Sequence, residues 1–85
     1  MATEFSYPLD FEQYTPAELA DLIGFLDDVE AYTKGRGHID EKRLIEQYAT
    51  FKNILNNNAE EKRIDREFKR LTGISIYKTM RKITQ

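Results

Sequence analysis

The chain has 85 residues and a net charge of −2, with 40% hydrophobic and 12% aromatic residues. This composition excludes an intrinsically disordered chain, and the length leaves room for one core, so we expect a single domain over residues 1–85. The absence of cysteine and the presence of one histidine exclude disulfides and cysteine or multi-histidine metal sites, so we expect no metal and no cofactor. No apolar run approaches the ~18–20 residues of a membrane span, and the N-terminus lacks the features of a signal peptide. We therefore expect a cytoplasmic protein without membrane contact.

The first 14 residues show an alternating rather than a helical pattern. Their apolar positions, which alternate with polar residues and proline, are Phe5, Tyr7, Leu9 and Phe11. Period-two alternation predicts an extended segment with one apolar side. With no other strand to pair with, this segment should pack across the helices. The alternative is that it forms a free docking peptide for a partner.

The first helix is expected at about 15–34. Thr15 and Glu18 form a capping-box pattern, with proline between them at the first helical position, and Gly35 ends the helix. Gly24 weakens the helix interior, which the close approach of another element would explain. The apolar residues at helical spacing are Leu19, Leu22, Ile23, Leu26 and Val29.

The second helix is expected at about 40–56, after a glycine-containing loop. No preceding strand or Walker motif accompanies these glycines, so a plain loop is favoured over phosphate binding. His38, which follows the loop, is interpreted as a surface residue, and Asp40 is the expected N-cap. Three asparagines starting at Asn56 end the helix and open a turn. The expected buried face comprises Leu44, Ile45, Tyr48, Phe51, Ile54 and Leu55.

The third helix is expected at about 59–72, with Asn58 as its N-cap and Gly73 at its end. Its apolar stripe is narrow, because charged residues occupy most other positions, so most of its circumference should be exposed. The stripe consists of Ile64, Phe68 and Leu71.

A short fourth helix is expected at about 75–84, with Ser75 as its cap. Helical spacing turns Ile76, Met80 and Ile83 inward, and Tyr77 is compatible with either side. Together the four segments predict an all-α domain, a compact bundle of three longer helices and one short C-terminal helix. The extended aromatic N-terminal segment should pack on this bundle.

Charge is distributed unevenly along the chain. Residues 1–58 carry 5 basic and 11 acidic side chains, whereas residues 59–85 carry 8 basic and 4 acidic ones. Such an asymmetry can steer a partner of opposite charge, although it also arises when two helices are simply solvated by different charges. The candidate interaction surface at the basic end consists of Lys69, Arg70, Tyr77, Lys78, Arg81 and Lys82.

Signals of catalysis are weak. Asp27 and Asp28 are adjacent in the sequence and therefore point in different directions from a helix, so they cannot converge as an acid and a base. Glu60 and Glu61 are explained by their place in the first turn of a helix. Nucleophilic catalysis needs a base beside a serine or threonine, and the single loop histidine offers little. We therefore expect no enzymatic activity.

The basic C-terminal helix pair bears some likeness to a helix-turn-helix, which places its second helix in the major groove of DNA. The likeness is limited, because Lys69 stands where close helix crossing needs a small residue, and because the net charge is negative. The alternative is that Gly73 only ends a helix and that the basic residues are solvated. Association with nucleic acid through this helix pair is thus the alternative function and is not the favoured one.

Several tracts in this order resemble the small bacterial proteins of uncharacterised protein family 0223. They are the Phe5–Asp10 opening, the helix start at Thr15–Glu18, the Ala59–Arg63 tract and the Gly73–Tyr77 tract, together with Glu67 and Phe68. The sequence departs from the family pattern at Thr72 and Ile74, where a serine and an aromatic residue are more usual, and its Gly35–His38 loop is longer. The resemblance covers about residues 5–82 and implies a compact all-helical fold with no assigned activity.

The sequence thus favours a cytoplasmic protein of unknown activity that serves as a non-catalytic protein-interaction module. Its partner is an unknown protein, and a second copy of the chain is one candidate, because the chain carries both signs of charge.

Overall fold

The computed structural model describes residues 12–35 and 37–84, and within these ranges the chain forms four helices and no strand. Each helix bound lies within one residue of the range expected from the sequence, and the all-helical class is confirmed for this part of the chain. The aromatic residues Phe5, Tyr7, Leu9 and Phe11 lie outside the described residues, so their packing stays a prediction. The helices are α1 (Pro16–Thr33), α2 (Glu41–Leu55), α3 (Asn58–Thr72) and α4 (Ile76–Thr84).

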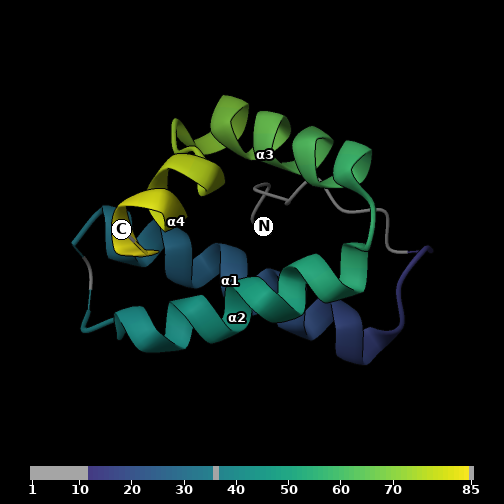
Figure 1. Ribbon diagram of the computed structural model, residues 1–85, viewed down its shortest axis with the longest axis horizontal. Helices are drawn as coiled ribbons and strands as arrows, with labels where there is room; N and C mark the ends of the chain where they lie inside the picture. The colour runs from purple at the N-terminus through teal and green to yellow at the C-terminus, as the bar shows by residue number, and fades with distance from the viewer. Residues whose placement is uncertain (1–11, 36, 85) are drawn as a thin grey trace, which may run out of the picture.

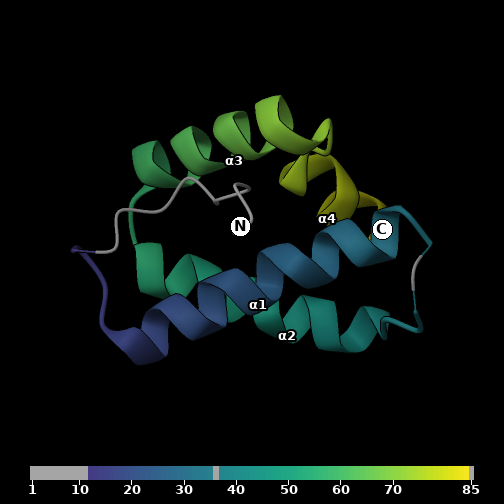
Figure 2. The same ribbon diagram turned by 180° about the vertical axis from the view of Figure 1, so that it is seen from behind.

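The four helices form two layers. α1 and α2 run antiparallel as one layer, and α3 with α4 covers one face of that pair (Figure 1). α4 lies at the end of the bundle where α1 leads into α2, and the view from behind shows the same arrangement (Figure 2). This topology brings the C-terminal ends of α1 and α3 to the same end of the molecule as α4.

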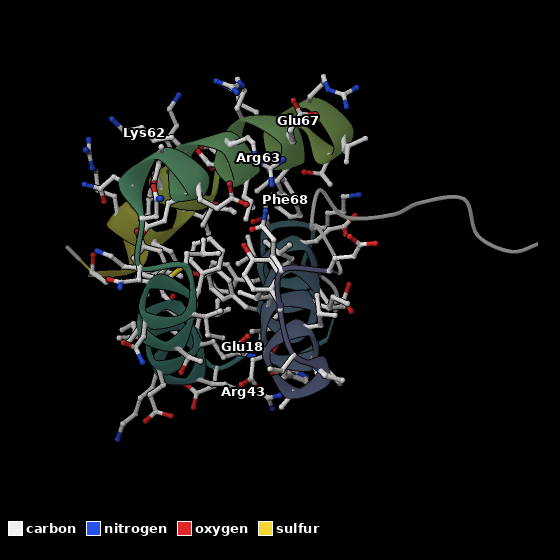
Figure 3. The ribbon with its side chains drawn as sticks, turned by 90° about the vertical axis from the view of Figure 1, so that its right-hand side faces the viewer. Glu18, Arg43, Lys62, Arg63, Glu67 and Phe68 are labelled. Atoms are coloured by element: carbon white, nitrogen blue, oxygen red, sulfur yellow. The ribbon has the colours of Figure 1, made fainter. Side chains whose placement is uncertain are left out.

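The core is built around three phenylalanines, one from each of the longer helices. Phe25, Phe51 and Phe68 are each at most 1% exposed. The ring centroids of Phe25 and Phe51 lie 5.0 Å apart, within the range of favourable aromatic pairs. Phe68 points from α3 toward the α1–α2 pair, whereas Lys62 lies on the outer side of α3 (Figure 3). Burial of each ring contributes roughly 1.5–3 kcal/mol, so α3 is held mainly by its narrow apolar stripe.

The helix starts follow local side-chain chemistry. The expected capping box of α1 is confirmed, with the Glu18 N–H donating to Thr15 Oγ1 at 3.1 Å and the Thr15 N–H donating to Glu18 Oε1 at 3.0 Å. The expected N-cap of α3, Asn58, was wrong by one residue. The side chain of Asn57 accepts the hydrogen bonds from the backbone N–H groups of the first turn. Asn56 takes up the left-handed conformation that ends α2, with φ +48°, and this leaves Asn57 extended and free to cap.

Several expectations about buried faces were wrong in detail. Ile45 and Leu71 are 41% and 40% exposed, because the width of each stripe is set by the neighbouring helices and not by apolar character alone. Tyr48 is half-buried, since its ring stacks on Phe25 while its edge reaches the surface. The burial of Phe25 was not predicted from the sequence, although this residue lies between other buried positions of α1. The described buried core comprises Leu22, Phe25, Leu26, Val29, Leu44, Phe51, Leu55, Ile64, Phe68, Ile74, Ile76 and Met80.

Candidate functional site

The turn between α3 and α4 is fixed by side-chain hydrogen bonds. Gly73 ends α3 in the left-handed region with φ +81°, a conformation that costs glycine little. The Thr72 hydroxyl donates to the Phe68 carbonyl at 2.7 Å and accepts from the Ile74 N–H at 3.1 Å. These contacts bury Ile74 against the core, and they set the direction in which α4 leaves the turn.

The start of α4 is capped twice. The expected cap by Ser75 is confirmed, since its Oγ accepts from the Lys78 N–H at 3.3 Å. Asp65 of α3 adds a second cap, because its Oδ1 accepts from the Ile76 N–H at 2.6 Å. A carboxylate at a helix N-terminus also meets the positive end of the helix dipole. The orientation of α4 is thus coupled to α3 by a charged contact, which positions its basic face.

One surface hollow is lined by three of the predicted site residues, Lys69, Lys78 and Lys82. It is called the lysine hollow below. The hollow has a volume of about 320 Å³ and lies where the ends of α1 and α3 meet α4. Among the described residues none of the three lysines forms an ion pair, and no carboxylate belongs to the lining. The other lining residues are Thr33, Gly73, Ile74, Ser75 and Thr79.

The other three predicted site residues lie elsewhere. Arg70 is paired with Glu67 on its own helix, at an N–O distance of 2.7 Å. Tyr77 and Arg81 line a second hollow of about 290 Å³ on another face of α4. Helical geometry explains this division, because Lys78 and Lys82 are four residues apart on one face of α4, and so are Tyr77 and Arg81 on the next. The second hollow is completed by Tyr48, Met80 and Thr84.

Glu61, which the sequence pattern explains by its place in the first turn of a helix, is a buried carboxylate that contacts Tyr77 of the second hollow. Glu61 is 5% exposed, and its Oε1 accepts a hydrogen bond from the Tyr77 hydroxyl at 3.2 Å. Burial, followed by the charge of Glu61, raises the pKa of Tyr77 to about 12. The signal was present in the sequence, because Glu61 lies three residues before Ile64 and seven before Phe68 on the same stripe.

The shifted pKa values of two α3 carboxylates, Glu60 and Glu67, come from contacts on the helix surface. The Arg63 guanidinium, which donates to both oxygens of Glu60 at 3.0 and 2.7 Å, lowers the pKa of the Glu60 carboxyl. Tyr14 donates to the same carboxylate at 3.3 Å and thereby joins the segment before α1 to α3. Arg70 likewise lowers the pKa of Glu67. Each of these shifts arises from an ion pair between neighbouring side chains of α3.

A groove of about 540 Å³ runs between α1 and α2. Gly24 lies in this groove, and a methyl group placed on it would meet no other part of the described chain within 4 Å. The expected close approach of another element at Gly24 is therefore wrong. Gln47 Oε1 is buried at this groove without a hydrogen-bond partner among the described residues. Arg43, which lies on the side of α2 turned away from α3, pairs with Asp28 at 3.5 Å (Figure 3).

Neither a metal-binding cluster nor a membrane-spanning helix is found among the described residues. In residues 12–35 and 37–84 no group of three or more histidine, aspartate or glutamate side chains is arranged to hold a metal ion. Over the same part of the chain, every helix is too short or too polar to cross a membrane. His38 is exposed, in agreement with its interpretation as a surface residue.

The fold and its surface define a small helical protein in which three lysines of α3 and α4 line one hollow. A profile of the Uncharacterised protein family (UPF0223) matches residues 4–85, and the chain belongs to that family. It is 38% identical over 80 residues to a UPF0223 protein of Streptococcus pneumoniae (strain CGSP14), and 39% identical over 80 residues to one of Streptococcus gordonii (strain Challis). Both alignments cover 94% of this chain and 84% of the relative. No solved structure matches the chain significantly.

Proposed function

We propose that this protein is a non-catalytic interaction module of the cytoplasm that binds a partner protein through the end formed by α3 and α4. The observation that carries the proposal is the lysine hollow, whose described lining includes three lysines and no acidic residue. Like charges held together without compensation cost free energy, and a partner of opposite charge removes that cost.

Adjacent apolar and aromatic surface adds to this support. Leu71 is 40% exposed next to the turn, and Tyr77 is half-buried beside the second hollow. Protein interfaces combine aromatic residues with a charged or polar rim, and the α3–α4 end offers both kinds of group. The charge would speed the encounter with a partner, and the apolar contacts would slow its dissociation.

Nucleic acid is the alternative partner, and the rest of the chain argues against it. Residues 1–58 carry 11 acidic and 5 basic side chains, so a polyanion extending beyond the hollow would meet repulsion. Binding to nucleic acid would also weaken steeply with added salt, because each phosphate contact releases counterions. Salt titration therefore separates a phosphate-driven contact from a protein interface with an apolar component.

The test is affinity capture from an extract of the source cells with the intact chain as bait. Two variants of equal charge loss are compared with the wild type. The hollow variant carries Lys69→Gln, Lys78→Gln and Lys82→Gln. The control variant carries Lys42→Gln, Lys62→Gln and Arg66→Gln, all exposed positions outside the lysine hollow.

We expect a protein that the wild type and the control variant retain and that the hollow variant loses. Nuclease treatment of the extract should leave the capture intact. If the hollow variant retains every partner, or if nuclease releases them, the proposed function is wrong. Fractionation of the cells tests the cytoplasmic location, which a membrane-bound pool of the protein would contradict.

A further inference from the structure

The lysine hollow carries more positive charge than the helix ends around it require. The C-terminal ends of α1 and α3 border the hollow through Thr33 and Gly73. Each C-terminal end carries about half a negative charge, so together they offset about one of the three lysines. Asp65 adds a negative charge nearby, but it is bound to the positive N-terminus of α4 through the Ile76 N–H. Between about one and two positive charges therefore remain for a ligand.

The donors in the hollow suit an oxyanion with several acceptor oxygens. A lysine ammonium offers three donors without a fixed planar fork, so lysines can surround a tetrahedral anion, whereas a carboxylate is matched best by the arginine fork. The two arginines that the sequence assigned to this end, Arg70 and Arg81, are absent from the lining. Ser75 Oγ accepts from the Lys78 N–H and so keeps its own proton to donate.

From this arrangement we infer that the lysine hollow binds a phosphate monoester group carried by the partner protein, a phosphorylated side chain. Such a group carries about −1.5 to −2 charges at pH 7, which matches the charge left over in the hollow, and it has three strong acceptor oxygens. A single carboxylate carries only one charge and would leave part of that surplus unmatched. The inference rests on the proposed function, because it identifies the group by which the partner is recognised.

The geometry also explains why one phosphate group is favoured over a chain of them. Lys78 and Lys82 follow one another along one face of α4, and Lys69 of α3 lines the same hollow, so the three lysines share one site. Arg81 points to a different hollow, and Arg70 is paired with Glu67. A polyphosphate backbone needs a continuous basic track, which these arginines do not extend.

The test is a two-dimensional amide NMR titration of the intact wild-type chain at low salt. The probes are a short phosphoserine peptide, the same peptide with serine, inorganic phosphate, and a single-stranded RNA. We expect saturable shifts confined to Thr33 and the stretch from Lys69 to Lys82, with the phosphoserine peptide binding more tightly than the serine peptide, inorganic phosphate or the RNA. The hollow variant should bind the phosphoserine peptide roughly tenfold or more weakly, because charge-assisted hydrogen bonds are lost, and the control variant should match the wild type.

Several outcomes would overturn the inference. They are equal binding of the serine peptide, binding of inorganic phosphate as tight as that of the phosphoserine peptide, tighter binding of the RNA, and no saturable shift at all. Equal weakening in both variants would reveal general charge attraction and would also overturn it. The wild-type shifts decide the matter even if the hollow variant folds poorly. If the phosphoserine peptide fails but the hollow variant still loses a captured protein, the proposed function stands and only the phosphate inference falls.

Discussion

Asp65 of α3 holds the first turn of α4, because its Oδ1 accepts a hydrogen bond from the Ile76 N–H at 2.6 Å. Helix N-termini are usually capped by the residue just before them, and Ser75 does this here as well. The additional cap comes from 11 residues earlier in the sequence and therefore links two helices. The position of α4, and with it the lysine hollow, depends on this contact.

We expect Asp65→Ala to destabilise the protein by about 1–2 kcal/mol, because a backbone N–H at the start of α4 loses its acceptor. Urea unfolding measures this loss, and amide exchange should show it first in α4. Asp65→Asn retains an acceptor oxygen and should lose less. Equal losses in the two variants would mean that the charge of Asp65, and not its hydrogen bond, stabilises α4.

Phe51→Ala should lower the free energy of unfolding by about 3–5 kcal/mol, because it removes a ring that is 1% exposed and packs on Phe25. The matched control is Ile45→Ala on the same helix, where the side chain is 41% exposed and the loss should stay below about 1 kcal/mol. Denaturant unfolding of both variants provides the measurement. Similar losses for the two would show that the buried face of α2 is assigned wrongly.

Gly24→Ala should stabilise the protein by roughly 0.5–1 kcal/mol, because alanine restricts the unfolded chain and favours the helix. The added methyl group enters open space at the α1–α2 groove, since no other part of the described chain comes within 4 Å of it. Thermal unfolding should show a higher Tm. A lower Tm would instead indicate that the groove accommodates something for which the glycine is required.

Tyr77 should make stability depend on pH in the alkaline range. Its pKa is raised from 10.0 to about 12, so the folded state binds a proton that the unfolded state releases. The associated stability is fully present below about pH 10 and is lost as the pH rises through about 12. Comparison of the wild type with Tyr77→Phe in urea between pH 8 and pH 11 measures it. Their difference should shrink as the pH rises, and parallel curves would contradict the raised pKa of Tyr77 in the folded state.

Self-association is the simplest interaction that the uneven charge distribution allows, because the basic end of one copy can bind the acidic part of another. A dimer formed by the basic end of one copy and the acidic residues 1–58 of another should appear at low salt and dissociate at high salt, because salt screens exposed charges. Sedimentation at two ionic strengths provides the measurement. A monomer under both conditions eliminates this dimer, whereas a dimer at high salt would require an apolar interface.

The sequence alone determined the helices and their ends, because these depend on groups close together in the chain. The capping box at Thr15 and Glu18, the left-handed turn at Gly73 and the apolar spacing of Ile64 and Phe68 act over one or two helical turns. Such local patterns place residues on a helix face, but they do not show which neighbouring helix covers it. For that reason the exposure of Leu71 was predicted wrongly.

Only the tertiary structure determined which of the basic residues lie together on the surface. The sequence grouped six side chains into one surface, whereas packing of α4 against α2 and α3 turned Lys78 and Lys82 toward Lys69 and turned Arg81 toward Tyr48. Glu61 is a second example. Its spacing from Ile64 and Phe68 places it on the buried stripe, but only the tertiary structure supplies Tyr77 as the hydrogen-bond partner that a buried carboxylate requires. Rotation of a helix about its own axis is set by contacts between segments far apart in the sequence, and no local pattern encodes it.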